Sequence, residues 1–289
     1  MFVWGLTFVS TKVLLEYLTP LDILLSRTIL GFTALCLVSP HILRTHRRSD
    51  ELLFALAGLT GAFGYYLAEN TALQFADASF VSVAVSTAPL FTGALGFALL
   101  KEEGFGVRFV LGFVIALFGI ALVSFAEGPA HASPIGIALC LGAALAWAAY
   151  SLIVKRLASF GYATIPMTKR IFIWGLTFMA VTRIAIGGAF PIEALTQPTV
   201  LTNLAFLGIF ASAGCFVTWG YSVKHLGATA ASAYIYLQAP ITVVAAVILL
   251  GEPMTGLIAL GIALVLVGLC LSEDFDQQLA KFIRPANDE

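Results

Sequence analysis

The sequence is poor in charge. Only 11% of its 289 residues are Asp, Glu, Lys or Arg, whereas a soluble domain carries about 25%. Hydrophobic residues make up 60% of the chain, and the mean hydropathy is +0.98. A water-soluble monomer of this composition would expose more hydrocarbon than it tolerates. The composition therefore excludes a soluble enzyme and a nucleic-acid-binding protein, and it predicts a helical protein of the lipid bilayer.

The sequence also lacks residue patterns that would hold a metal, a nucleotide or a disulfide. Cys36, Cys140, Cys215 and Cys270 stand far apart within apolar runs, which favours small buried apolar groups over a zinc site or a redox pair. A GxxxxGK(S/T) phosphate loop and an HExxH pair are both missing, which argues against an ATP-driven pump and a membrane protease. The sequence also has no pattern of like residues that would form the selectivity ring of a channel. We therefore expect no catalytic residue, no metal site and no cofactor.

Long apolar runs are what the sequence has in abundance. A helix needs about 20 mostly apolar residues to cross the hydrocarbon core of a bilayer. Ten runs qualify, at approximately 1–18, 21–40, 52–73, 78–100, 105–126, 134–156, 164–188, 200–223, 229–250 and 255–272. Polar or proline-containing turns separate them. The predicted fold class is an all-α polytopic membrane protein with ten transmembrane helices.

The basic residues predict the orientation, because cytoplasmic loops carry an excess of Lys and Arg. If the N-terminus is cytoplasmic, all but three of the 15 basic residues belong to the cytoplasmic side, the exceptions being Lys12, Arg27 and Arg183. We therefore expect a multi-pass protein of the cell inner membrane with both termini cytoplasmic. Residues 273–289 would form a cytoplasmic tail.

The two halves of the chain resemble each other at nearly constant spacing. Trp4 and Lys12 are eight residues apart, as are Trp147 and Lys155. Further matches are Arg27 with Arg170, Pro89 with Pro240, Glu103 with Glu252, Gly112 with Gly261, and Gly119 with Gly268. Each half holds five runs, an odd number, so the second half must enter the membrane upside down relative to the first. We predict two inverted five-helix repeats, at 1–127 and 134–272.

The repeat also predicts that the first helix is short. About 13 residues of the span precede Trp147, whereas three precede Trp4. We expect the natural chain to begin upstream of Met1, with about ten more residues in this helix.

Inverted repeats are typical of secondary transporters, in which the substrate site lies near the midplane between the halves. A membrane scaffold that arose by gene duplication is the alternative. Pro89 and Pro240 fall at the centres of equivalent spans, where a proline removes a hydrogen bond and bends the helix. We interpret them as paired conformational hinges, with a role in packing alone as the alternative.

Several motifs in the repeats match a known family. They are residues 4–8 (WGLTF), Arg27, the segment around Pro89, residues 99–103 (LLKEE) with Gly112 and Gly119, residues 147–150 (WAAY), and residues 249–253 (LLGEP) with Gly261 and Gly268. On these residues the chain resembles the EamA family of the drug/metabolite transporter superfamily over nearly its whole length. The resemblance implies a ten-helix inner-membrane carrier that works by alternating access, with a central cavity lined mainly by helices 1, 3, 4, 6, 8 and 9. Members are described as exporters of amino acids, other metabolites and drugs, so the motifs mark the fold and not the substrate.

The candidate substrate-binding residues are aromatic and polar side chains of these spans. They are Trp4, Thr7, Tyr66, Glu69, Asn70, Thr87, Trp147, Tyr150, Trp219, Tyr221, Tyr234 and Gln238. An aromatic cavity with a few polar groups suits an amphipathic organic solute. Alternatively, Trp and Tyr also form belts at membrane interfaces and contacts between helices.

Charged residues within the spans are the remaining candidates. A charge at membrane depth costs about 3 kcal/mol on insertion scales, so Glu69 is a candidate proton carrier. The alternatives are that Glu69 reaches the outer interface or pairs with Arg27. We interpret Arg27 and Arg170 as anchors at helix ends in preference to substrate ligands.

Together these observations predict a secondary carrier. It would export small metabolites such as amino acids or related amphipathic solutes, energised by the solute gradient or by proton exchange. Its partners would be a small-molecule solute, the lipid bilayer and, if coupled, protons, with no nucleic acid. The alternatives are an importer or exchanger of similar solutes and a non-transporting scaffold or sensor. The oligomeric state stays open.

Overall fold

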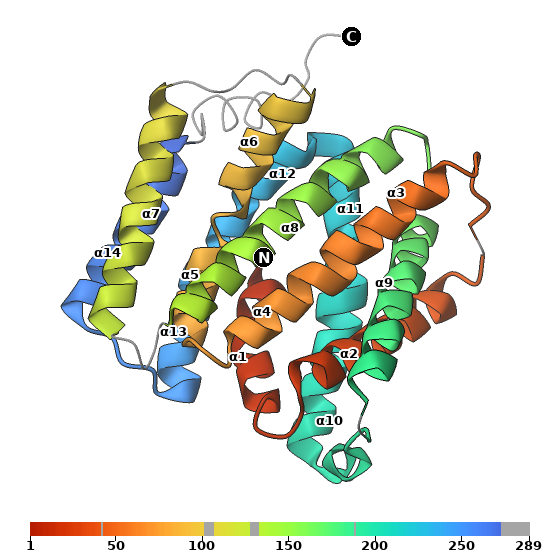
Figure 1. The fold of residues 1–289 in the computed structure, drawn as a ribbon, viewed down its shortest axis with the longest axis horizontal. Coiled ribbons are helices and arrows are strands. Elements are labelled where there is room, and N and C mark those ends of the chain that lie inside the picture. Colours follow the sequence, from red (N-terminus) through yellow and green to blue (C-terminus); the bar gives the residue numbers. More distant parts are fainter. Residues whose placement is uncertain (42, 101–106, 128–132, 188, 273–289) are drawn as a thin grey trace.

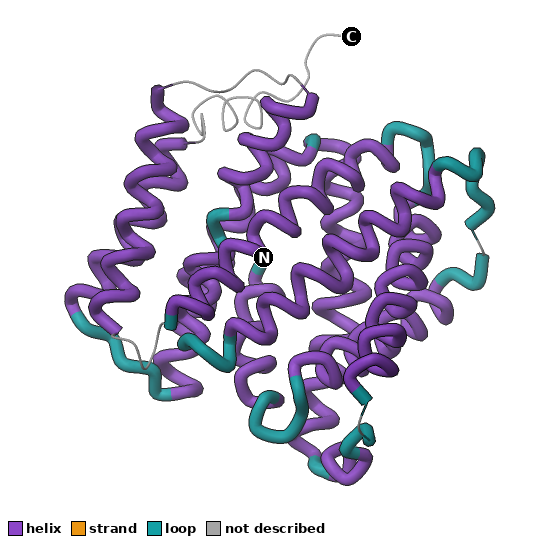
Figure 2. The backbone as a smooth tube through the Cα atoms, in the orientation of Figure 1, coloured by secondary structure: helices purple, strands orange, loops and turns teal. Residues whose placement is uncertain are grey.

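The computed structural model describes residues 1–41, 43–100, 107–127, 133–187 and 189–272, which form helices joined by short loops (Figure 1, and as a backbone tube in Figure 2). The first half consists of α1 (Phe2–Leu14), α2 (Pro20–Val38), α3 (Asp50–Ala57), the π-helix η1 (Gly58–Tyr65), α4 (Tyr66–Ala72), α5 (Ala78–Val85), α6 (Ala88–Leu100) and α7 (Val107–Glu127). The second half consists of α8 (Pro134–Ala158), α9 (Thr164–Ile186), the 3₁₀ turn η2 (Ile192–Thr196), α10 (Pro198–Ala205), the π-helix η3 (Phe206–Gly214), α11 (Cys215–Leu226), α12 (Ala228–Ala233), the 3₁₀ turn η4 (Tyr234–Leu237), α13 (Gln238–Leu250) and α14 (Gly256–Ser272).

Joined end to end, these segments form the ten helical rods that the sequence predicts. Six of the described rods are long and apolar enough to cross a membrane. The first rod is shorter than the predicted 1–18, because the chain turns at residues 15–18 and α2 begins at Pro20. The 13 residues of α1 rise only about 20 Å. The predicted tail 273–289 and Glu103 lie outside the described residues.

The two halves interlock, because each helix packs against a partner from the other half. The first-half helix α2 packs on η3, and its counterpart α9 packs on η1. In the same way α1 packs on α13, while α8 packs on α5 and α6. The pair α7 and α14 stands side by side at one edge of the molecule (Figure 1). Each of the pairings named here recurs with the halves exchanged, as expected for an inverted repeat.

Glycines make the contact between α7 and α14 close. A Cβ atom on Gly119 would lie 2.6 Å from the carbonyl oxygen of Gly261, and one on Gly268 would lie 2.5 Å from that of Gly112. Gly112 corresponds to Gly261 in the repeat, and Gly119 corresponds to Gly268. The two contacts are therefore images of each other under the two-fold relation of the halves.

Four rods depart from regular α-helix, in two equivalent pairs. The rod of α5 and α6 breaks at Ser86 and Thr87, just before Pro89, and the rod of α12 and α13 narrows to the 3₁₀ turn η4 just before Pro240. The interruptions lie where the sequence predicts bends at Pro89 and Pro240. The π-helices η1 and η3 form the second pair, and nothing in the sequence pattern led us to expect them. π-Helical turns within α-helices are frequent at functional sites.

Candidate functional site

Three tryptophans meet at the interface of the two halves. The ring of Trp147 on α8 lies 5.3 Å from that of Trp4 on α1 and 5.1 Å from that of Trp219 on α11. All three side chains are buried. The sequence places Trp4 and Trp147 at equivalent positions of the repeat, and the two-fold relation brings them together in an edge-to-face contact.

Further aromatic rings extend this cluster. The Tyr65 ring lies 4.8 Å and the Tyr150 ring 5.0 Å from that of Trp147. Phe216 stacks on Tyr66 at 5.8 Å. Tyr65 and Phe216 were not among the predicted site residues. Phe216 precedes Trp219 by three residues, which places both on one face of α11, and this spacing could have identified it.

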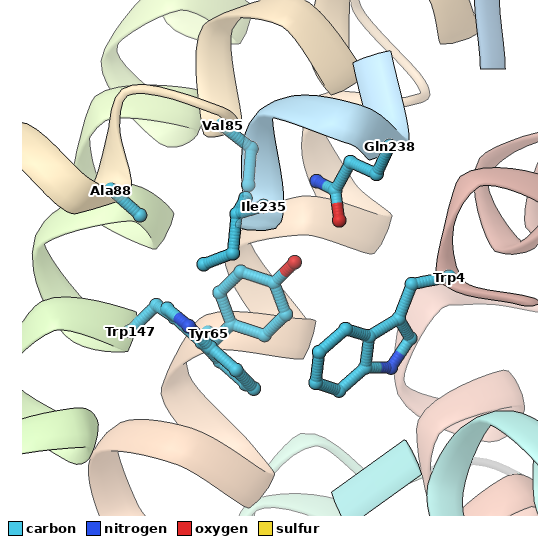
Figure 3. Close-up of a pocket in the computed structure, with 7 residues that line it drawn as sticks. All are labelled: Trp4, Tyr65, Val85, Ala88, Trp147, Ile235 and Gln238. Atoms are coloured by element: carbon cyan, nitrogen blue, oxygen red, sulfur yellow. The ribbon is translucent and has the colours of Figure 1, made fainter. Parts of the chain in front are cut away.

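A small pocket lies against the aromatic cluster (Figure 3). Its walls are Trp4, Tyr65, Val85, Ala88, Trp147, Ile235 and Gln238. Val85 and Ala88 flank the break between α5 and α6, and Ile235 lies in η4. Both helix interruptions therefore reach the pocket, and Figure 3 shows the Tyr65 hydroxyl and the Gln238 amide turned toward its interior.

The pocket is very small. The space that the centre of a water-sized sphere can occupy is about 10 Å³, which corresponds to about one water molecule. No amino acid fits into this volume. In this conformation the pocket is therefore too small for the expected solute.

A buried polar group of side chains lies behind the pocket wall. Arg27 of α2 is fully buried, donates from Nε to Ser212 Oγ of η3 at 3.0 Å, and places its guanidinium carbon 4.0 Å from the centre of the Tyr66 ring. In the part of the chain that the structure describes, Nη1 and Nη2 of Arg27 have no hydrogen-bond partner. The interpretation of Arg27 as an anchor at a helix end is therefore wrong, because α2 continues well beyond it on both sides and its side chain points into the protein.

Glu69 of α4 belongs to the same polar group. Its side chain is 1% exposed, and Arg27 and Tyr65 act on its charge. Among the described residues neither carboxylate oxygen of Glu69 has a hydrogen-bond partner. Glu69 therefore does not reach the outer interface, which was one of the alternatives.

The other predicted polar residues are also buried, and three of them use a donor within the fold, while Asn70 Oδ1 has no hydrogen-bond partner among the described residues. Thr7 donates to the Trp4 carbonyl and Thr87 to the Ala84 carbonyl, each at 2.6 Å. Asn70 donates to the Pro20 carbonyl at 3.2 Å. Thr7 and Thr87 therefore offer a bound solute little beyond their oxygen lone pairs.

Two predicted residues lie outside the site. The side chain of Tyr221 is 59% exposed and that of Tyr234 is 43% exposed, on the outer surface of the bundle. Tyr221 follows Trp219 by two residues, which turns it to a different face of α11. In η4 it is Ile235 and Tyr236 that are buried. Neither Tyr221 nor Tyr234 contributes to the pocket in this conformation.

Comparisons with known proteins agree with this architecture. The model of the EamA-like transporter family matches residues 1–125 and 134–273. A "probable amino-acid metabolite efflux pump" of Escherichia coli is 27% identical over 280 residues, covering 93% of this chain and 91% of its own. A "probable terminal-alkyne amino-acid exporter" of Streptantibioticus cattleyicolor is 28% identical, covering 93% of this chain and 89% of its own. A solved crystal structure shares the fold with a TM-score of 0.66 at 18% identity, covering 95% of both chains.

Proposed function

Since the chain belongs to the EamA-like transporter family, we propose that this membrane transporter exports amino acids or related amphipathic metabolites by alternating access. In this proposal it resides in the cell inner membrane with both termini cytoplasmic. The repeats at 1–127 and 134–272 would move relative to each other around the aromatic cluster, and residues 273–289 would be a cytoplasmic tail.

Buried donors without partners are the observation that carries the proposal. The indole N–H groups of Trp147 and Trp219 and the amide nitrogen of Gln238 have no hydrogen-bond partner among the described residues. A buried polar group without a partner costs about 1–3 kcal/mol. A solute that offers acceptors next to an apolar body would satisfy these donors and pack against the rings. Amino acids have this chemistry, and two relatives are named as exporters of amino acids or their metabolites.

The small volume of the pocket fits a closed state in the transport cycle. Room for a solute would open where the helices are already interrupted, because Val85, Ala88 and Ile235 form pocket walls next to the two breaks. Pro89 and Pro240 prevent these breaks from closing into regular helix. They would therefore act as the hinges of the opening.

Proton exchange is the proposed source of energy. Glu69 of α4 is a buried carboxylate, and Arg27 of α2, Tyr65 of η1 and Cys140 of α8 lie close enough to interact with its charge. A carboxylate at membrane depth is a common proton carrier in transporters. Binding of a proton and of a solute at neighbouring groups would couple their movements.

Counterflow in proteoliposomes tests the function directly. Purified protein is reconstituted into vesicles loaded with one unlabelled amino acid, and entry of the same labelled amino acid is followed for a panel of amino acids. We expect saturable flux for at least one member of the panel. Flux equal to that of protein-free vesicles for every member would instead favour a scaffold or sensor.

The direction of transport needs a second measurement. Cells that overproduce the protein should resist toxic analogues of the carried amino acid and should accumulate that amino acid in the medium. Greater sensitivity to the analogues would indicate import and would overturn the export part of the proposal.

A further inference from the structure

We propose that Arg27 binds the carboxylate of the transported solute, so that the carrier selects amino acids over the corresponding amines and amides. This inference rests on the proposed function and deepens it, because it assigns the group that sets the substrate class. Arg27 was expected to be a structural anchor, and its environment shows why that role does not suit it.

The free donors of Arg27 are the first argument. A guanidinium carries five N–H donors, and only the Nε donor is used, by Ser212. Nη1 and Nη2 have no partner in the described part of the protein although the residue is fully buried. Charged side chains at membrane depth are costly and usually mark a substrate or ion pathway. A solute anion would supply the missing partner.

The orientation of the guanidinium is the second argument. Ser212 binds Nε on one edge, and the Tyr66 ring lies 4.0 Å from the guanidinium carbon and covers one face. The edge formed by Nη1 and Nη2 stays free. Two parallel N–H groups on this edge match the two oxygens of a carboxylate. Because two protein contacts already fix the plane of the group, less conformational entropy is lost on binding.

The comparison with Arg170 is the third argument. Arg170 is the repeat equivalent of Arg27, yet its Nη2 lies 2.6 Å from Glu51 Oε1, and both side chains are partly exposed. Arg170, which also lies within its helix and not at the end, is thus held by a carboxylate of a neighbouring helix. The two-fold relation of the halves therefore breaks at this pair of positions. Arg27 is the member that is buried and left with free donors.

The position of Arg27 relative to the pocket defines the movement that binding requires. The Tyr66 ring lies against the guanidinium of Arg27 and is 4.8 Å from the ring of Tyr65, which lines the pocket. Separation of these two rings would connect Arg27 with the pocket. Glu69 lies about one turn after Tyr66 on the rod formed by η1 and α4. Its carboxylate supplies negative charge near Arg27. The carboxylate of a solute in the pocket would then reach the free edge of Arg27.

The experiment compares three solutes that differ only at the carboxylate. Leucine, leucinamide and 3-methylbutylamine compete for counterflow of labelled leucine, and the same triplet is built on another amino acid if the panel favours one. Wild-type protein should bind the amino acid at least tenfold more tightly than the amide or the amine. In Arg27→Gln the amino acid should lose about ten- to a hundredfold in affinity, while the amide and the amine change less than threefold.

Arg170→Gln is the matched control, because it is the same substitution at the equivalent position of the repeat. It should keep the full preference for the carboxylate even if it lowers stability. Arg27→Lys retains the charge without the paired N–H groups and should keep part of the preference, and it also serves as the readout if Arg27→Gln does not fold. Unchanged preference in Arg27→Gln, or in Arg27→Lys where Arg27→Gln does not fold, would overturn the assignment. So would a wild-type protein that carries the amine as well as the amino acid.

Failure of this inference differs from failure of the proposed function. A carrier that transports amino acids with Arg27→Gln unchanged in preference is still a carrier, with another group as the carboxylate ligand. Absence of counterflow for every member of the panel in the wild-type protein would instead remove the proposed function itself.

Discussion

Buried charge is the feature that matters most for individual residues, because only a partner or a function offsets its cost in a membrane. Glu69 and Arg27 are both buried without a hydrogen bond between them. Lys12 is a charged residue for which partners within the protein offset this cost. Its ammonium group donates to the carbonyls of Leu73 and Ala76, at 2.7 and 2.8 Å, and thereby satisfies acceptors at the end of α4.

Replacing Glu69 tests the coupling to protons. In Glu69→Gln the side chain keeps its size but cannot bind and release a proton, so uptake driven by a pH gradient across the vesicle should fall to background. Exchange of one solute molecule for another needs no net proton movement and should stay within about threefold of wild type. Both fluxes are measured in the same proteoliposomes.

Glu16→Gln provides the control for the Glu69 experiment, because Glu16 is a solvent-exposed carboxylate outside the polar group. It should leave both fluxes unchanged. A pH-driven flux that survives in Glu69→Gln would show that the energy comes from another source.

The aromatic residues illustrate how far single residues could be predicted. The repeat identified Trp4 and Trp147, because equivalent positions in inverted halves face each other across the two-fold axis. It could not decide between Trp219 and Tyr221, because aromatic character alone does not tell a buried face from a lipid-facing one. The burial of Arg27 could not be predicted either, because it depends on a residue far away in the sequence. Arg27 Nε donates a hydrogen bond to Ser212, which lies 185 positions further along the chain.

The helical elements owe their packing to small residues on facing surfaces. Gly31 of α2 lies against the carbonyl of Gly208 in η3, and Gly58 of η1 lies against the backbone of α9 at Gly175. Small residues let helices approach closely in a membrane, where van der Waals contact is a main source of helix association. The pair α7 and α14 depends most on this contact, because each packs chiefly against the other.

Adding a methyl group to α7 tests this packing. In Gly119→Ala the new Cβ would lie 2.6 Å from the Gly261 carbonyl oxygen and 2.8 Å from Val265. Overpacking of this kind typically costs about 1–3 kcal/mol. We expect the midpoint of thermal unfolding in detergent to fall by several degrees, because a change of 1 kcal/mol shifts the midpoint by about 2–4 °C in chains of 150–250 residues.

Gly142→Ala is the matched control for Gly119→Ala. Gly142 also lies within a helix, α8, but its added Cβ would meet no atom within 4 Å. Because alanine favours helix over glycine by about 1 kcal/mol, this substitution should keep or raise the unfolding midpoint. Equal midpoints for the two variants would show that the glycine contact does not limit stability.

The ends of the helices could be predicted to within a few residues, whereas their internal geometry could only partly be predicted. Apolar runs end where polar residues, proline or glycine begin, so α2 and α8 start at Pro20 and Pro134 as expected. The breaks before Pro89 and Pro240 could be predicted, because proline has no backbone N–H to donate and its ring clashes with the preceding turn of the helix. The π-helices have no such local cause in the sequence. They lie where Gly58 and Gly208 press against neighbouring helices, which only the tertiary structure defines.

At the scale of the whole molecule, contacts between the halves tie both ends of the bundle. At one end the Glu252 carboxylate accepts hydrogen bonds from the backbone N–H groups of Ala78 and Ser79, at 2.7 and 3.0 Å, and so holds the loop after α13 to the start of α5. At the other end Glu51 of α3 pairs with Arg170 of α9. Figure 1 places the start of α3 and the end of α13 at opposite ends of the molecule.

A tyrosine strengthens the end that holds Glu51. Tyr162 donates to Asp50 Oδ2 at 2.6 Å, and its hydroxyl accepts a hydrogen bond from the His46 backbone N–H at 2.8 Å. Burial, together with the bond to Asp50, raises the pKa of the Tyr162 phenol, so the hydroxyl stays protonated and keeps donating. By the predicted orientation this end is cytoplasmic and the Glu252 end is external. Alternating access requires that these two ends open one at a time.

Loosening one end should therefore expose the pocket to one side of the membrane. In Glu252→Gln the charge at the start of α5 is lost, and a carboxylate at a helix N-terminus is worth about 0.3–2 kcal/mol. A shift of about 1 kcal/mol changes the ratio of two conformations about fivefold. A cysteine introduced as Ala88→Cys, in a background without the four native cysteines, should then react severalfold faster with an impermeant thiol reagent from outside. Glu51→Gln should accelerate the same reaction from the cytoplasmic side in inverted vesicles. Acceleration from both sides in either variant would mean that the substitution disrupts the fold generally, and the two ends would then not act as separate gates.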